Sequence, residues 1–405
     1  MNNSLHVGLD LGTTSLVALR VCPADGSRRI LEIANPQFTF GYDVISRMER
    51  AMAGEGALLQ EVLVEGVEKL LKGAGCCQYF PSNVQVVVAA NPAISYLLTG
   101  KPVEDILFPP HRPSENFGSF IPQEETGLSF PIFLFPMVSG YVGGDLVACL
   151  YALDNSPPGT LLIDLGTNAE IALKTETGWL ATSVAAGPAF EGGDIRCGMR
   201  ATEGAIADVQ LEGERFSLKV VGGGTPRGVC GSGLMSAIAA ALDAKLLSAD
   251  GTLLQTDEID TNLSRYVVEG DSGRELLLYR DARRSVVLTQ HDIRQFQLAK
   301  GAVHAGVRCL LERAGITEEQ VSEIILTGAF GHGIPHSALK RVALLPRKMV
   351  DKVRFTPAGV LDGLQRFLLQ NDGPAKLGAF VKTIKAYPLS GTPAFERAFI
   401  NALNF

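Results

Sequence analysis

Two short segments of the chain share one pattern of apolar and polar positions. Residues 6–21 read HVGLDLGTTSLVALRV, and residues 160–175 read TLLIDLGTNAEIALKT. Each segment has an apolar run, then Asp-Leu-Gly-Thr and a polar residue, and then a second apolar run. Glycine at the turn between two such runs predicts a β-hairpin. Because the hairpin recurs after a domain-sized gap, we expect two copies of one structural unit.

Longer segments have the apolar spacing of helices and alternate with strands. Residues 56–73 place apolar side chains at helical intervals, and residues 83–90 form a short β-branched run typical of a buried strand. The clearest helix spans residues 289–315, where Thr289 and Asp292 match a capping box. This alternation predicts an α/β fold with a mixed or parallel sheet.

Proline and glycine mark the boundaries between these segments. Residues 101–136 are rich in proline and phenylalanine, and they are too apolar for a solvated linker. We interpret them as an irregular excursion from a folded domain. Residues 155–159, Asn-Ser-Pro-Pro-Gly, carry the strongest turn signal between the hairpins. We therefore expect two domains, residues 1–157 and residues 158–405.

Composition and charge narrow the classes of protein. The chain has 405 residues, of which 46% are hydrophobic and 20% charged, and its formal net charge is -7. Such a composition is globular and excludes a disordered, collagenous or coiled-coil protein. A general nucleic-acid binder would show a basic patch or stripe. The sequence has no secretory signal and no apolar run of about 20 residues, so we expect a cytoplasmic protein that binds neither nucleic acid nor membrane.

The cysteines and histidines do not form a recognisable metal site. Seven cysteines are widely spaced, and no C-x2-C pair occurs among them. Cys76 and Cys77 are the one close pair, and we interpret them as ordinary thiols. The six histidines show no metal-ligand spacing. We expect no protein-bound metal beyond Mg²⁺ and no iron–sulfur cluster in this chain.

The turn of the first hairpin has residue types suited to phosphate binding. Asp10 ends the first strand and could hold Mg²⁺, commonly through waters. Gly12 allows the backbone to approach a ligand closely. The amides and hydroxyls of Thr13 and Thr14 could donate to phosphate oxygens. A simple tight turn would explain a single copy of this motif equally well.

The second hairpin repeats the motif with Asp164, Gly166, Thr167 and Asn168. Two such hairpins facing each other across a cleft would bring two carboxylates and two sets of amides to one phosphate chain. That arrangement suits phosphoryl transfer, where positioning and charge neutralisation supply most of the catalysis. One carboxylate would orient the metal and the other the attacking water, so both aspartates are candidate metal and catalytic residues.

A third candidate element follows the apolar run of residues 323–326. Small residues at the end of a strand leave a flat surface on which a purine could lie. A strand-to-helix turn is the structural alternative, but the two preceding hairpins favour adenosine contact. The candidate residues are Gly328, Ala329, Phe330 and Gly331.

Three further candidates have ordinary structural explanations beside the functional ones. Glu191 lies in a glycine-rich loop that begins at Gly187, and it could reach a metal or water, or the loop could only set a turn. Gly231 and Ser232 precede an apolar helix, so their amides could face a phosphate. Ser232 as an N-cap explains the same residues. Lys300 could contact a phosphate or ribose, or it could simply be solvated.

Two Asp-x-Gly-Thr hairpins followed by a glycine-rich loop resemble the superfamily of acetate and sugar kinases, heat-shock chaperone ATPases and actin (ASKHA). Longer segments resemble, more narrowly, the C-terminal ATPase region of the reductive activators of corrinoid proteins (RACo). These segments are NPQFTFGYDVISRMERAM, FPMVSGYVGGDLVACL, LLIDLGTNAEIAL, AAGPAFEGGDIRCGMRA, GVCGSGL, TQHDIRQFQLAKGAVHAG and LTGAFGHGI. With the first hairpin and the C-terminal segment, the likeness covers nearly the whole chain.

The resemblance implies two ribonuclease-H-like lobes of the actin-like ATPase type, with Mg-ATP in a cleft between them. In such activators, ATP binding and hydrolysis are coupled to one-electron reduction of a Co(II) corrinoid protein to Co(I) in a methyltransferase system. Family members also suggest a homodimer. The residues that match the two phosphate motifs and the adenosine motif are Asp10, Gly12, Thr13, Thr14, Asp164, Gly166, Thr167, Asn168, Gly328, Ala329, Phe330 and Gly331.

The sequence departs from full-length activators at one point. They carry an N-terminal ferredoxin-like domain with a [2Fe–2S] cluster, whereas this sequence begins at the ATPase hairpin. We therefore expect the electron to come from a separate ferredoxin-like protein. Two other functions stay open: a small-molecule kinase on the same fold, and a nucleotide-gated binding protein that closes on ATP without turning it over.

Overall fold

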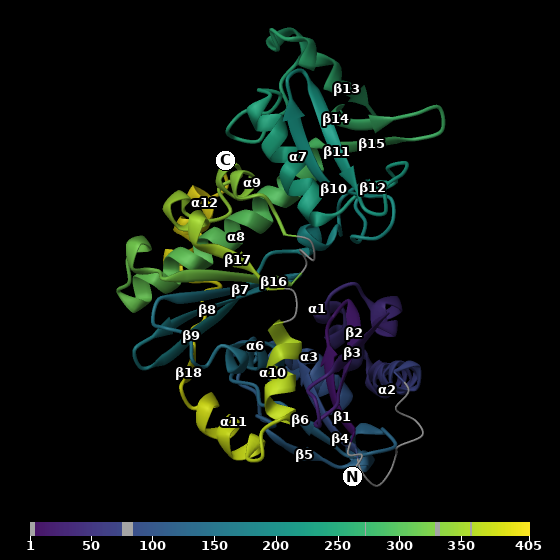
Figure 1. Ribbon diagram of the computed structural model, residues 1–405, viewed down its shortest axis with the longest axis vertical. Coiled ribbons are helices and arrows are strands. Elements are labelled where there is room, and N and C mark those ends of the chain that lie inside the picture. Colours follow the sequence, from purple (N-terminus) through teal and green to yellow (C-terminus); the bar gives the residue numbers. More distant parts are fainter. Residues whose placement is uncertain (1–4, 75–83, 272, 329–332, 357–358) are drawn as a thin grey trace. The chain divides into compact units, whose positions relative to one another are not determined.

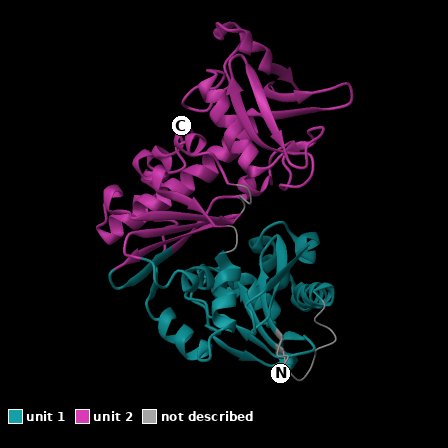
Figure 2. Cartoon of the chain, viewed as in Figure 1, with its two compact units in different colours: residues 1–156, 176–181, 358–387 teal, residues 157–175, 182–357, 388–405 magenta. Residues whose placement is uncertain are grey.

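A computed structural model describes residues 5–74, 84–271, 273–328, 333–356 and 359–405. Its chain forms two compact units, each of which is discontinuous in sequence (Figure 2). Unit 1 contains residues 1–156, 176–181 and 358–387, and unit 2 contains the remainder. The single boundary that we expected at residues 157/158 therefore does not describe the late segment 358–387, which packs with the first half of the chain.

Unit 1 is built on a six-stranded sheet with the order β3-β2-β1-β4-β6-β5 (Figure 1). The predicted first hairpin is confirmed, because β1 and β2 pair antiparallel. β4 lies parallel to β1 on its other side, with Asp10 opposite Ala89. The strands of this sheet are β1 (Leu5–Leu11), β2 (Ser15–Val21), β3 (Arg28–Ala34), β4 (Val84–Ala90), β5 (Ser119–Ile121) and β6 (Ile132–Leu134).

Helices cover both faces of this sheet, and alternation along β1 shows why. Val7 and Leu9 share a buried core with Leu63 of α2, whereas Gly8 faces Leu364 of α10 on the opposite side. The other helical segments complete the two layers. The helices of unit 1 are η1 (Pro36–Phe40), α1 (Val44–Arg50), the π-helical η2 (Ala51–Glu55), α2 (Gly56–Gly73), α3 (Pro92–Leu98), α4 (Glu104–Leu107), α5 (Gln123–Thr126), α6 (Gly144–Ala152), α10 (Gly359–Leu368) and α11 (Gly373–Val381).

Glycine explains how α10 joins unit 1 from late in the sequence. A Cβ atom at Gly363 would lie 2.9 Å from the Cα of Ala148 in α6, and closer still to that residue's carbonyl oxygen. Only a residue without a side chain permits this approach of two helix backbones. Arg366 reinforces the contact by donating to the carbonyl oxygen of Tyr151 at 2.6 Å. Sequence periodicity along either helix gives no sign of this pairing.

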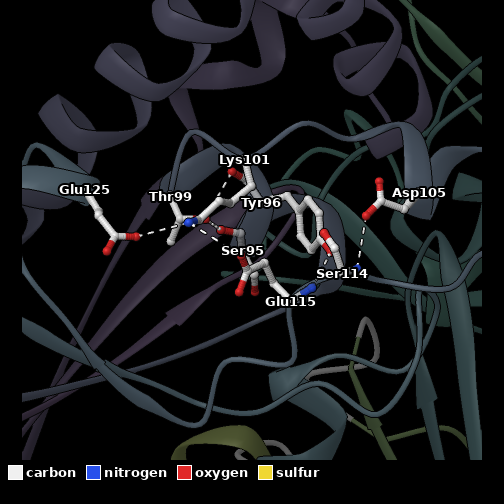
Figure 3. Close-up of polar contacts among 8 residues, drawn as sticks. All are labelled: Ser95, Tyr96, Thr99, Lys101, Asp105, Ser114, Glu115 and Glu125. Carbon is white, nitrogen blue, oxygen red and sulfur yellow. Dashed lines mark hydrogen bonds and ion pairs between the residues drawn. The ribbon is translucent and has the colours of Figure 1, made fainter.

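The segment 101–136 is more regular than we expected. Its apolar end forms β6, a buried strand parallel to β4, so the interpretation as an irregular excursion is wrong there. Polar contacts anchor the rest (Figure 3). The Lys101 ammonium lies 3.5 Å from a Glu115 carboxylate oxygen and 3.3 Å from one of Glu125. The Tyr96 hydroxyl accepts from the Glu115 amide at 3.1 Å.

Unit 2 contains the second predicted hairpin, β7 and β8, which is confirmed as an antiparallel pair. The sheet that contains this hairpin has the order β17-β16-β7-β8-β9-β18, and β16 runs parallel to β7. Two of its strands are counted at least partly with unit 1, because β18 and residues 178–181 of β9 fall within the segments of that unit. Two smaller three-stranded sheets, β11-β10-β12 and β13-β14-β15, follow. The strands are β7 (Thr160–Leu165), β8 (Asn168–Thr175), β9 (Gly178–Ala185), β10 (Ala205–Glu212), β11 (Arg215–Val220), β12 (Gly228–Val229), β13 (Val267–Gly270), β14 (Gly273–Arg280), β15 (Ser285–Thr289), β16 (Glu323–Gly328), β17 (Val353–Phe355) and β18 (Ile384–Ala386).

The long predicted helix is confirmed as α8 (Gln290–Ala314), and Thr289 and Asp292 form its capping box. Gly306 lets it pack closely on Ile171 of β8. The other helices are η3 (Pro188–Glu191), α7 (Gly231–Asp243), η4 (Thr256–Glu258), η5 (Asn262–Tyr266), η6 (Glu318–Gln320), α9 (His336–Arg341), η7 (Arg347–Lys352) and α12 (Pro393–Asn401). In the part of the chain that the structure describes, no helix has both the length and the apolar character needed to cross a membrane.

Candidate functional site

The turn of the first hairpin is held by donors from outside the hairpin. The backbone and side-chain amides of Asn35 donate to the carbonyl oxygens of Thr14 and Gly12, at 3.0 and 2.9 Å. Arg47 donates through Nη2 to the carbonyl oxygen of Thr13 at 2.8 Å. In a trans peptide group, the N–H of one residue points opposite to the C=O of the residue before it. When a supporting residue holds one of these carbonyl groups, the amide of the following residue therefore points away from that support. An anion-binding turn requires amides that point outward in this way.

The side chains around this turn are arranged for donation. Asn91 Nδ2 donates to the Thr13 hydroxyl oxygen at 3.2 Å, which leaves the threonine's own proton to donate elsewhere. Asn91 also caps α3, because its Oδ1 accepts from the Ile94 amide. Asp10 lies one residue before the end of β1, at the edge where β1 and β4 both finish. The first hairpin turn thus places one carboxylate and a set of donors together.

Asp145 is a candidate residue that our sequence reasoning missed. It lies in the first turn of α6, and its Oδ1 accepts from the Leu146 amide at 2.8 Å. A Cβ atom at Gly143 would lie 2.7 Å from both Asn91 Cα and Asp145 Oδ1, so the start of α6 packs against the residue that supports Thr13. Burial raises the Asp145 pKa to about 6. Gly-Gly-Asp before an apolar helix was the available signal.

The second hairpin has a comparable turn with different supports. The Gly166 amide donates to the Asn168 carbonyl at 3.1 Å, and the Gly187 amide donates to the Thr167 carbonyl at 2.8 Å. The Thr167 hydroxyl donates to Glu191 Oε2 at 2.9 Å. The loop that contains Gly187 and Glu191 therefore contacts the second hairpin turn directly.

Gly328 is brought against the carboxylate of the second motif. β16 pairs with β7 so that Thr327 lies opposite Asp164 and Gly328 opposite Leu165. Gly328 has a φ of 90°, and a Cβ atom there would lie 2.8 Å from the Leu165 nitrogen and closer still to Asp164 Oδ1. The remaining residues predicted for adenosine contact, Ala329, Phe330 and Gly331, lie outside the described residues, as do Cys76 and Cys77.

Gly231 and Ser232 begin α7, but Ser232 does not cap the helix. The N-cap residue is Cys230, without a side-chain cap bond. The Ser232 hydroxyl donates instead to the Ala207 carbonyl at 2.9 Å, so the N-cap explanation is wrong. The hydroxyl ties the start of α7 to β10. Contact of Gly231 and Ser232 with a nucleotide stays a prediction.

Lys300 has partners at the C-terminal end of the chain. Its side chain is fully buried, and its ammonium donates to the Asn404 carbonyl oxygen. The ammonium also lies 5.1 Å from the centre of the Phe405 ring. The solvated alternative is therefore wrong. Burial lowers the Lys300 pKa to about 8. Contact with a phosphate or ribose stays untested.

Each unit, taken separately, fits part of a magnesium–nucleotide site. In each, an aspartate lies one residue before the end of a strand, and the glycine-containing turn that follows has carbonyl groups that accept hydrogen bonds from the protein. Carboxylate oxygens suit Mg²⁺, which prefers oxygen ligands. Backbone amides and threonine hydroxyls suit phosphate oxygens. The donor sets at Asp10 and Asp164 therefore suit Mg²⁺ and phosphate, and binding of either group stays a prediction.

Comparisons with known proteins identify the same family for both halves of the chain. Residues 159–405 match the family model described as the C-terminal domain of RACo, the ASKHA domain, and residues 5–155 match the RACo middle region. The chain is 29% identical to the corrinoid activation enzyme RamQ of Eubacterium limosum, over 97% of this chain and 69% of that one. It is 24% identical to the [Co(II) methylated amine-specific corrinoid protein] reductase of Methanosarcina barkeri, over 86% of this chain and 67% of the relative.

A solved structure shares its fold with the whole of this chain. The reductive activator for a corrinoid, iron–sulfur protein superposes with a TM-score of 0.88 at 27% identity. The match covers 100% of this chain and 66% of that one. The chain thus spans about two thirds of the length of each of these relatives.

Proposed function

Because this chain belongs to the RACo family and has the ASKHA, actin-like fold, we propose that it is a Mg-ATP-dependent ATPase that assists reduction of a corrinoid protein from Co(II) to Co(I). The two hairpin turns carry the proposal: in each, carbonyl groups are engaged by the protein and the following amides are directed away. The corrinoid protein enters the proposal as the partner because the names of the relatives refer to corrinoid activation or to a corrinoid protein.

In this proposal the residues of the two motifs bind the phosphate chain. The amides of Thr13, Thr14 and Thr167 and the hydroxyls of Thr13 and Thr14 would donate to phosphate oxygens, and Asp10 and Asp164 would hold the metal through oxygen atoms. Mg²⁺, when bound, would neutralise charge that develops on the phosphates. Precise positioning and charge neutralisation are the main requirements of phosphoryl transfer.

Asp145 is proposed to accept the proton of the attacking water. The water oxygen would bond to the γ-phosphorus, the bond to the ADP oxygen would break, and the proton would pass to the Asp145 carboxylate. A carboxyl whose pKa is about 6 is mostly ionised at neutral pH and is more basic than an ordinary carboxyl.

Glu191 would hold the Thr167 side chain in place, because its Oε2 accepts a hydrogen bond from the Thr167 hydroxyl at 2.9 Å.

The redox half of the proposal needs an external donor. A reduced ferredoxin-like protein would lose one electron, and the Co(II) corrinoid would gain it. If the corrinoid protein binds differently to the ATP-bound and ATP-free forms, the binding difference shifts its effective potential. For one electron, about 60 mV corresponds to about 1.4 kcal/mol. A coupling of ~1–3 kcal/mol would therefore be useful.

The test is optical. The protein, Mg-ATP, reduced ferredoxin and a Co(II) corrinoid protein are mixed, and the cobalt absorption is followed for Co(I), with a no-ATP control. Asp10→Asn and Asp164→Asn should abolish the ATP-dependent part. Asp25→Asn, on the exposed β2–β3 turn, is the matched control and should retain it.

Each other outcome selects a different function. ATP-dependent Co(I) formation that survives both Asp10→Asn and Asp164→Asn would contradict the assignment of the phosphate motifs. Transfer of the γ-phosphate to a metabolite would identify a small-molecule kinase. Tight ATP binding without phosphate release would identify a nucleotide-gated binding protein. Phosphate release without Co(I) would leave an ATPase without the redox role.

A further inference from the structure

Arg47 is a buried cation behind the first phosphate motif. It lies on α1 and is 1% exposed. Its Nε donates to the Gly41 carbonyl oxygen at 3.0 Å, and its Nη2 donates to the Thr13 carbonyl oxygen at 2.8 Å. Its third nitrogen, Nη1, is buried and has no hydrogen-bond partner. The guanidinium thus touches the turn and retains unused donor capacity.

The charge of Arg47 is not balanced by a neighbouring ion pair. Within residues 5–74 and the other described ranges, no carboxylate lies within ion-pair distance of its guanidinium. Asp43, one helical turn earlier, accepts instead from the amide and hydroxyl of Ser46, each at 2.9 Å. Burial lowers the Arg47 pKa to about 10, and the charge of nearby Asp43 offsets only part of this effect. Burying a cation without a direct ion pair is unfavourable.

A structural role alone does not account for this arrangement. A neutral asparagine or glutamine amide could bond one of the carbonyl groups without burying a charge, as Asn35 does for Gly12 on the same turn. A buried cation becomes favourable when an anion arrives close to it. The turn that Arg47 supports is the one whose amides are directed toward a phosphate in the proposed function.

We propose that Arg47 is a positioning residue of the first phosphate motif, which holds Thr13 so that the following amide faces a nucleotide phosphate, and whose charge favours that phosphate. This inference rests on the proposed function. The bound phosphate would supply an anion close to the guanidinium, which forms no ion pair among the described residues. Arg47 acts through the Thr13 carbonyl, and no direct contact with the nucleotide is required.

The test separates phosphate recognition from stability. Calorimetric titration with ATP, ADP and adenosine is performed on the full chain carrying Arg47→Met, Arg47→Lys or Arg50→Met. Arg50 lies on the same helix, is 48% exposed at its side chain and pairs with Glu55 at 3.0 Å, so it is the matched control. We expect Arg47→Met to weaken ATP binding by about tenfold or more, because the variant loses both a buried positive charge near the phosphate and the support that orients the turn. Adenosine affinity should change by less than about twofold.

The outcomes distinguish this inference from the proposed function. Wild-type protein that binds no ATP would overturn the proposed function itself. Wild-type binding with Arg47→Met equal to Arg50→Met would overturn only the role of Arg47, as would an equal loss of ATP and adenosine affinity. If Arg47→Met does not fold, Arg47→Lys decides, because it keeps the charge but not the fork of donors. It should bind ATP more weakly than wild type, and an affinity equal to that of wild type would overturn the role of the donor fork.

Discussion

Replacing Gly328 by alanine tests whether β16 fixes the Asp164 carboxylate. Gly328 has a φ of 90°, which costs an alanine about 1–2 kcal/mol. The new methyl group would also overlap the Leu165 backbone and Asp164 Oδ1. Overpacking of this kind costs about 1–3 kcal/mol. We therefore expect Gly328→Ala to lower the free energy of unfolding by about 2–5 kcal/mol and to reduce ATP hydrolysis by moving Asp164.

A matched control isolates the contribution of the close approach. Gly273 has a φ of 105°, and a Cβ atom there meets nothing within 4 Å. Gly273→Ala should therefore cost only the backbone strain, about 1–2 kcal/mol, and leave ATP hydrolysis unchanged. Unfolding in urea is followed by fluorescence of Trp179, the one tryptophan of the chain, in the same sheet as Gly328. If the two variants unfold within about 0.5 kcal/mol of each other, the close packing on Asp164 is refuted.

Three other predictions concern single ionisable groups. Glu191→Gln retains an oxygen acceptor for the Thr167 hydroxyl, so its free energy of unfolding should stay within about 0.5 kcal/mol of the wild-type value. ATP turnover should fall, because the negative charge is lost. Unchanged turnover would exclude a role for that charge. Asp145 has a pKa raised from 3.8 to about 6, so the folded state binds more protons in that window. Its contribution to stability should therefore fall as the pH rises through that window. ATP hydrolysis should fall as the pH drops through about 6, because the carboxylate becomes protonated. Asp145→Asn should remove the first dependence in urea titrations at several pH values and the second in a pH–rate profile. Lys300 has a pKa lowered from 10.5 to about 8, so the unfolded state binds more protons between these values. Stability should therefore rise with pH across that range, and Lys300→Met should abolish the rise; a persistent rise would assign it to another group.

Local pattern was sufficient to predict the hairpins and the long helix. In both hairpins, Asp-Leu-Gly-Thr between apolar runs identifies the turn, because glycine and the alternating strands are themselves the structural cause. For α8, the capping box and the apolar spacing act within one helix, so a single segment contains the information. Such features depend on neighbours in sequence.

The rest of the site depends on neighbours in space. Asn35, Arg47 and Asn91 all bond to the first turn, yet they come from three separate elements. Nothing in their local sequence distinguishes them from surface residues or ordinary caps. Asp145 was missed because its raised pKa comes from burial in the folded chain, although Gly-Gly-Asp before an apolar helix was a local signal. The placement of β6 was missed because a short apolar run beside prolines has no clear period.

The two turns are supported by groups of opposite charge, and this difference has a consequence. Arg47 lies behind the first turn, whereas Glu191 accepts a hydrogen bond from the second. A buried cation favours an anion nearby, and a carboxylate favours a cation. Under the proposed function, substitution of Arg47 should chiefly reduce affinity for the phosphates, whereas substitution of Glu191 should chiefly change the Mg²⁺ concentration needed for half-maximal hydrolysis. Equal effects of both variants on both quantities would show that the shared backbone geometry, and not the opposed charges, determines how each turn binds its ligand.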